Sequence, residues 1–150
     1  MIDHIVFAVP DLIWGIEYIK EKTGISPVIG GQHQGLGSWN ALLSLGPNVY
    51  LEIIAPDPKQ PIKPIWLGLK NLQSPRLTRW AAKSNHIDQL YESAQKMSID
   101  IGSIAPYQRK KEDGSLLSWK LSNPLTDHGD GLIPFFIDCT VFICEYKILN

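Results

Sequence analysis

The 150-residue sequence has little cysteine, no long apolar run and almost no net charge. Its two cysteines, Cys139 and Cys144, are too few for a disulfide framework and match no metal-binding spacing. No apolar stretch approaches the roughly 18 residues that a membrane span needs. Asp3 and His4 stand where the apolar segment of a signal peptide would begin. We therefore expect a cytoplasmic protein with no membrane segment.

Basic residues are scarce and scattered. The 14 lysines and arginines nearly balance the 15 aspartates and glutamates, so the net charge is −1. The longest basic cluster, residues 109–111, is followed at once by Glu112 and Asp113, which leaves no positive surface suited to nucleic acid. A chain that is 44% hydrophobic and 19% charged has the balance of a globular protein, and its length fits one domain.

Hydrophobic patterning predicts a strand, a helix and further strands in each half of the chain. The first helix has Asp11 as its cap and Gly24 at its end. The predicted strands cover residues 2–9, 27–33, 40–45, 49–55, 77–83, 103–109, 115–121 and 132–138, and the predicted helices cover residues 12–22 and a stretch that starts at 87, capped by Ser84 or Asn85.

The segments between these elements have distinct compositions. Residues 30–39 contain four glycines and are predicted to form a loop that acts as a lid. Four prolines in residues 56–64 predict a stiff linker, and residues 65–72 are predicted to form a short helix.

The second half of the chain repeats the first. A shift of 75 residues places His4 on Arg79, and a shift of 82 or 83 places Glu52 on Pro134 or Phe135. Each half then has the order βαβββ. We predict module one at 1–56, a linker at 57–75, module two at 76–138 and an apolar tail at 139–150 that packs as a strand.

Stretches in both halves of the chain carry a resemblance to a known family. IDHIVFAVPDL at 2–12, NALLSLGPNVYLEIIAPDP at 40–58 and GLIPFFID at 131–138 resemble glyoxalase-like domains of the vicinal oxygen chelate superfamily. The resemblance implies an α+β fold in which two paired βαβββ modules form curved mixed sheets around a cavity. In metal-dependent members each module supplies two ligands, one from its first strand and one from its last. The metal chelates adjacent oxygens of the substrate, whereas other members bind ligands without turnover.

The resemblance implies four ligand positions, and two of them carry ligating side chains. His4 and Glu52 match the positions in the first module and suit Zn, Ni, Mn or Fe. Arg79 cannot ligate a metal because it stays protonated. Neither Pro134 nor Phe135 is a ligand, so the implied metal site is half present.

Three interpretations of His4, Glu52 and Arg79 stay open at this point. In the first, His4 and Glu52 hold a divalent metal ion. In the second, no metal is bound, His4 and Glu52 act as an acid/base pair, and Arg79 binds a carboxylate or enolate oxygen. In the third, the three residues form a structural ion-pair network. The first two describe a lyase, isomerase or dioxygenase that acts on a small oxygenated substrate; the alternative function is a module that sequesters a small molecule.

Alternation along the strands predicts that Tyr50 flanks Glu52 and that Asn40 lines the neighbouring strand. The other candidate substrate contacts are Trp80, Trp119 and His33. The tryptophans would supply apolar surface, and His33 would reach the site from the 30–39 loop. Both modules lie in one chain, so we expect a monomer or homodimer whose partner is a small-molecule ligand.

Overall fold

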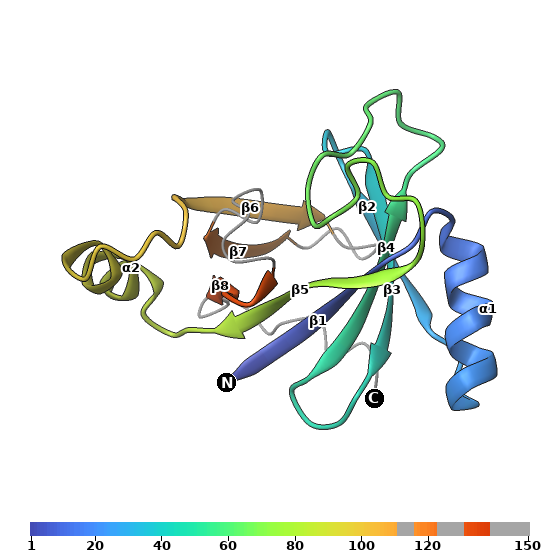
Figure 1. Ribbon diagram of the computed structural model, residues 1–150, viewed down its shortest axis with the longest axis horizontal. Helices are drawn as coiled ribbons and strands as arrows, with labels where there is room; N and C mark the ends of the chain where they lie inside the picture. Colours follow the sequence, from blue (N-terminus) through green and yellow to red (C-terminus); the bar gives the residue numbers. More distant parts are fainter. Residues whose placement is uncertain (111–115, 123–130, 139–150) are drawn as a thin grey trace.

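The computed structural model describes residues 1–110, 116–122 and 131–138, which form one curled mixed sheet and two helices (Figure 1). The elements are β1 (Ile2–Ala8), α1 (Leu12–Thr23), β2 (Val28–His33), β3 (Ser38–Ser44), β4 (Tyr50–Pro56), β5 (Arg76–Lys83), α2 (Ile87–Lys96), β6 (Ile104–Lys110), β7 (Leu116–Ser122) and β8 (Phe135–Asp138). The predicted α+β fold is confirmed, and the predicted tail at 139–150, with both cysteines, lies outside the described residues.

The two halves of the sheet have the same strand order. The strands follow one another as β2-β3-β4-β1-β5-β8-β7-β6, with β1 and β5 antiparallel at the centre. Strand β1 pairs in parallel with β4, and β5 pairs in parallel with β8. The halves are thus paired βαβββ units related by an approximate twofold axis between β1 and β5.

Helix α1 covers one face of the first half of the sheet. Asp11 accepts a hydrogen bond from the backbone N–H of Trp14 at 2.8 Å, and Gly24, at φ 74°, ends the helix in the left-handed region. The helix and the sheet share a core made of Val9, Leu12, Ile16, Ile19, Ala41, Leu43, Ile53 and Ala55. Gly15 allows a close approach, since a Cβ there would lie 2.9 Å from Val9 Cγ2.

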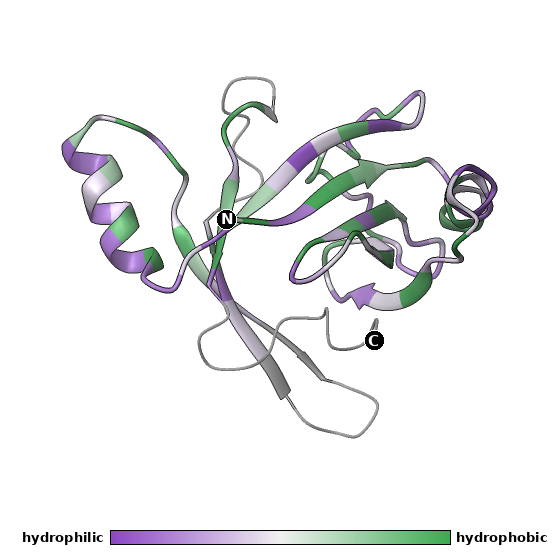
Figure 2. Cartoon of the chain, turned by 90° about the horizontal axis from the view of Figure 1, so that it is seen from below, coloured by the Kyte–Doolittle hydropathy of each residue, from purple (hydrophilic) through white to green (hydrophobic). Residues whose placement is uncertain are grey.

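Helix α2 begins differently from the prediction. Neither Ser84 nor Asn85 is its cap, which is His86 without a side-chain hydrogen bond. Instead Asp138, at the end of β8, accepts a hydrogen bond from the N–H of Ile87 at 3.2 Å. Both helices alternate hydrophilic and hydrophobic residues (Figure 2). Within the described ranges, neither is long and apolar enough to cross a membrane.

The face of the sheet turned away from α1, here called the inner face, carries the second core cluster. It joins both halves through Val6, Ala8, Ile54, Ala81, Leu121, Phe135 and Ile137. Trp66, Leu67 and Leu69 pack onto it from the segment between the halves. The predicted short helix at 65–72 is wrong, because Leu67, Gly68 and Asn71 have φ values of 50°, 80° and 58°.

The predicted loop at 30–39 is also wrong in extent. Strand β2 runs to His33 and β3 starts at Ser38, so the turn covers only residues 34–37. The glycines that suggested a loop serve the strand instead. A Cβ at Gly30 would lie 2.5 Å from Asn40 Oδ1, so glycine makes room for that side chain.

Candidate functional site

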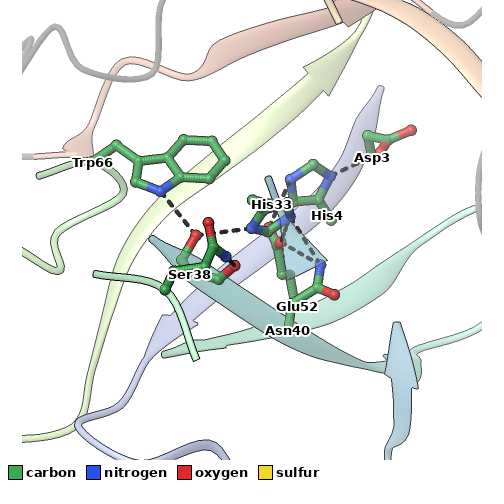
Figure 3. Close-up of polar contacts among 8 residues, drawn as sticks. Asp3, His4, His33, Ser38, Asn40, Glu52 and Trp66 are labelled. Carbon is green, nitrogen blue, oxygen red and sulfur yellow. Dashed lines mark hydrogen bonds and ion pairs between the residues drawn. The ribbon is translucent and has the colours of Figure 1, made fainter. Parts of the chain in front are cut away.

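Buried polar side chains from four neighbouring strands meet on the inner face of the first half (Figure 3). We call them the polar cluster; its members are Asp3 and His4 of β1, His33 of β2, Ser38 and Asn40 of β3, and Glu52 of β4. All but His33 are less than a tenth exposed. Because burying unpaired polar groups is costly, their contacts with one another decide what this region can do.

Glu52 is the centre of the polar cluster. Its Oε1 accepts a hydrogen bond from Asn40 Nδ2 at 2.7 Å. Its Oε2 lies 3.5 Å from His4 Nε2, and His33 Nε2 lies 3.8 Å from Oε1. A buried carboxylate is therefore held by one amide and flanked by two imidazoles, an arrangement suited to moving a proton.

The ring of His4 is fixed on three sides. Its Nδ1 lies 2.8 Å from Asp3 Oδ1. The ring stacks on Tyr50 with centroids 4.7 Å apart, and the edge of Phe135 meets it at 5.3 Å. These contacts leave Nε2 as the atom that faces Glu52.

Asp3 reaches His4 because of a β-bulge. Side chains of consecutive strand residues ordinarily point to opposite faces. Here Ile2 pairs with Ala82 and His4 with Ala81, so Asp3 is an extra residue in β1 and the pleat is locally broken. Lys83 Nζ lies 3.0 Å from Asp3 Oδ2. Burial raises the pKa of Asp3, but the hydrogen bond and charge of His4, followed by those of Lys83, outweigh burial and lower this pKa.

The segment between the halves closes over the polar cluster. Trp66 Nε1 donates a hydrogen bond to Ser38 Oγ at 3.0 Å, and His33 Nδ1 lies 2.9 Å from the same oxygen. The rings of Trp66 and His33 meet edge-on, with centroids 4.9 Å apart. His33 is therefore a half-buried strand residue and not part of a loop.

Of the residues singled out from the sequence, the structure brings His4, Glu52, Asn40, Tyr50 and His33 into contact with one another. Arg79 pairs with Val6 across β1 and β5, which puts it on the inner face beside this group. It is half-buried, and its Nη1 donates to the carbonyl of Thr78 at 2.9 Å.

The two tryptophans predicted as substrate contacts lie apart from the polar cluster. Trp80 pairs with Ile5, one position out of step with Val6, so it faces away from the inner face. Its Nε1 donates to the carbonyl of Leu132 at 3.2 Å, and its placement does not support the predicted role. Trp119 packs against the inner core in the second half, with its ring 6.4 Å from that of Tyr107.

Strand register decides which residue is equivalent to Glu52. Glu52 pairs with Val6, and Phe135 pairs with Ala81. The shift of 75 takes Val6 to Ala81 (6 + 75 = 81), so Phe135 and not Pro134 occupies the equivalent position (52 + 83 = 135). The four positions that the resemblance assigns to metal ligands thus hold His4, Glu52, Arg79 and Phe135.

The donor set does not fit a four-ligand metal centre. Arginine and phenylalanine supply no ligand atom at two of the four positions. Among the residues that the structure describes, no group of three or more His, Cys, Asp or Glu side chains is placed to hold an ion. Asn40 Nδ2 already occupies Glu52 Oε1 as a hydrogen-bond donor.

Sequence reasoning missed three residues of this region. Strict alternation assigns Asp3 to the face opposite His4, and no sequence pattern predicts the bulge that brings their side chains together. Ser38 lies within the stretch predicted as a loop, and Trp66 lies in the segment that was wrongly predicted to be a short helix. The adjacency of Asp3 and His4 in the sequence was the one available signal.

Comparison with known proteins identifies the family. A family model described as a glyoxalase-like domain matches residues 2–140. The chain belongs to the glyoxalase-like domain family. A search of curated proteins found no match.

Solved structures share the fold of this glyoxalase-like chain at low sequence identity. A hypothetical protein from Staphylococcus aureus has a TM-score of 0.69 and 16% identity over 91% of this chain and 57% of its own, so the chain spans little more than half of that relative. Methylmalonyl-CoA epimerase from Mycobacterium tuberculosis has a TM-score of 0.59 and 18% identity, and the match covers 91% of this chain and 86% of the epimerase. A variant of the Streptomyces coelicolor epimerase, in complex with 2-nitronate-propionyl-CoA, has a TM-score of 0.59 and 19% identity, and the match covers 94% of this chain and 95% of that variant.

Proposed function

We propose that this glyoxalase-like protein binds a small oxygenated organic substrate at the inner face and transfers a proton to or from one of its carbon atoms. The observation that carries the proposal is the setting of Glu52, a buried carboxylate held by Asn40 at 2.7 Å and flanked by His4 at 3.5 Å. Structural neighbours that include epimerases are consistent with this reaction class.

Glu52 is the group that exchanges the proton. A C–H bond next to a carbonyl breaks, its proton moves to a Glu52 oxygen, and the electron pair moves to the carbonyl oxygen as an enolate. Return of a proton to the same carbon completes the reaction without an oxidant or reductant. His4 Nε2 faces the other carboxylate oxygen, and Arg79 binds a carboxylate or enolate oxygen of the substrate.

No step of this proton transfer passes through a metal ion. Members of the superfamily commonly bind a divalent ion, and His4 with Glu52 would be the residues to hold Zn, Ni, Mn or Fe. With Arg79 and Phe135 at the other two positions, the chain lacks the donors for the usual set. Proton transfer is therefore assigned to the chain's own side chains.

Solvent deuterium exchange tests the proposal across several substrate classes at once. The protein is incubated in D2O with methylmalonyl-CoA, other acyl thioesters, α-hydroxy ketones and α-keto acids, and deuterium on carbon is measured by mass spectrometry. Wild type is expected to label at least one class, and Glu52→Gln to lower the rate by about 100-fold or more. Glu17→Gln is the matched control, because the Glu17 side chain is 65% exposed on α1.

The outcomes separate the candidate functions. Exchange that persists in Glu52→Gln at the wild-type rate would overturn the role of Glu52. Thermal stabilisation of wild type by a compound that it never labels would favour the non-catalytic binding module instead.

A further inference from the structure

A line of four charged or titratable side chains runs through the first half of the sheet. Lys83 Nζ lies 3.0 Å from Asp3 Oδ2, Asp3 Oδ1 lies 2.8 Å from His4 Nδ1, and His4 Nε2 lies 3.5 Å from Glu52 Oε2. Asp3 is fully buried, and the side chain of Lys83 is 19% exposed. Proton transfer at Glu52, as proposed above, needs neither Asp3 nor Lys83 in contact with a substrate.

The chemistry of the ring determines what Asp3 does. A neutral imidazole has a proton on one nitrogen and a lone pair on the other. An ionised carboxylate only accepts hydrogen bonds, so Asp3 keeps a proton on His4 Nδ1. The remaining nitrogen, Nε2, is then the one that exchanges or shares a proton with Glu52.

Lys83 keeps Asp3 in its accepting role. A buried carboxylate needs a partner for its second oxygen, and Lys83 supplies the charge at Oδ2. Lys83 is itself anchored at the end of β5, where its backbone N–H donates to the carbonyl of Met1 at 2.8 Å. The bulge in β1 makes the contact possible, because it turns Asp3 and His4 toward each other.

We propose that Asp3, fixed by Lys83, is a positioning residue that sets the tautomer of His4 and directs its Nε2 to Glu52. The inference rests on the proposed function for its catalytic meaning, but the tautomer can be measured without any substrate. Asp3 acts through His4 and touches no reacting atom.

The variant Asp3→Asn is expected to change which nitrogen of His4 carries the proton. The ammonium of Lys83 only donates, so the amide oxygen of the asparagine turns to Lys83 and its NH2 group turns to His4. An NH2 donor facing Nδ1 requires a lone pair there, which moves the ring proton to Nε2. The nearly isosteric change should therefore reverse the tautomer.

The test is nitrogen NMR of the full chain labelled with [15N]histidine, with His4→Gln used to assign the His4 signals. In wild type we expect Nδ1 of His4 to be protonated. In Asp3→Asn we expect the neutral ring to carry its proton on Nε2, and in Lys83→Gln a mixture of both forms. Asp88→Asn is the matched control, because it breaks an exposed ion pair with Lys120 and should leave the His4 signals unchanged.

Kinetics provide the second readout. With a compound that wild type labels in D2O, Asp3→Asn should lower kcat by about tenfold or more while KM changes less than about twofold. A wild-type His4 that is neutral with its proton on Nε2 would overturn the inference, and so would an unchanged tautomer in folded Asp3→Asn. A wild type that labels no compound would count against the proposed function alone, because the NMR result stands independently.

Discussion

The two halves of the sheet have the same strand order, but the inner face carries polar side chains in the first half and apolar side chains in the second. Register makes Glu52 equivalent to Phe135, as shown above. It also makes Asn40 equivalent to Leu121, because Asn40 pairs with Ile54, Leu121 pairs with Ile137, and 54 + 83 = 137. A polar pair in the first half thus corresponds to an apolar pair in the second.

The difference shows how one topology serves two purposes. In the second half, Phe135 and Leu121 join the hydrophobic core, where burial of apolar surface provides stability. In the first half, Asn40 and Glu52 are stable in the same layer because they contact each other and because the imidazoles of His4 and His33 flank Glu52. The fold provides the positions, and the residue types placed there decide between packing and chemistry.

The largest predicted effect is in the apolar half. Phe135→Ala should lower the free energy of unfolding by about 3–5 kcal/mol, because it leaves a cavity in the core and removes the ring edge beside His4. Urea denaturation measures the change. Leu132→Ala, at a side chain 80% exposed, should change it by less than about 0.5 kcal/mol. Equal effects at the two positions would show that the second half is not a packed core.

The second prediction replaces a polar residue of the first half by its apolar equivalent in the second half. Asn40→Leu introduces the residue type found at the equivalent position, Leu121. It should lower the free energy of unfolding by about 1–3 kcal/mol, because Glu52 Oε1 loses its hydrogen-bond donor inside the protein.

A double-mutant cycle sharpens this second prediction. Asn40→Leu combined with Glu52→Leu should cost less than the sum of the two single changes, with a coupling energy of about 0.5–3 kcal/mol. Chemical denaturation of the four proteins gives the coupling. Strict additivity would mean that the Asn40–Glu52 contact does not stabilise the first half.

The third prediction concerns Asp57, which follows β4 and ties down the 34–37 turn of the first half. It accepts hydrogen bonds from Gln32 Nε2 at 2.7 Å and Gln60 Nε2 at 2.9 Å. Burial raises the pKa of Asp57, but bonds from Gln60, the Lys59 N–H and Gln32 outweigh burial and lower it. Asp57→Asn should therefore lower the free energy of unfolding by about 1 kcal/mol at neutral pH.

The pH dependence of that cost has a definite sign. A carboxyl whose pKa is lower in the folded state stabilises the protein above its unfolded pKa of about 4, and the contribution is lost as pH falls through the folded pKa. The difference in melting temperature between wild type and Asp57→Asn should be constant above about pH 5 and shrink in more acidic buffer. Asp88→Asn, at an exposed side chain, is the control, and a gap that widens on acidification would contradict the assignment.

The smallest predicted effect concerns metal. Because the second half supplies no ligand at the positions of Arg79 and Phe135, Zn, Ni, Mn or Fe(II) at micromolar excess should change the free energy of unfolding by less than about 0.5 kcal/mol. A specific site filled at 100 times its Kd would add about 2.7 kcal/mol. Thermal melts with and without chelator, together with elemental analysis, measure this. Near-stoichiometric metal that is lost in Glu52→Gln would break the proposed difference between the halves.

Periodicity and caps were enough to predict most of the fold. Helix α1 was predicted from the spacing of Leu12, Ile16 and Ile19, with Asp11 and Gly24 at its ends, because these signals act within a few residues. The prediction of a helix at 65–72 was wrong. The apolar residues of this segment have a helix-like composition, but they pack onto the inner core with the backbone in left-handed turns.

The sequence by itself determined the class of fold and the repeat, since both depend on periodic patterns of nearby residues, and its resemblance to a known family singled out His4 and Glu52. Only the tertiary structure decided the rest. The bulge at Asp3, the choice of Phe135 over Pro134 and the outward position of Trp80 all depend on how strands distant in sequence pair in register. A shift of one residue in that register moves a side chain to the other face, and a single sequence does not encode such a shift in any local pattern.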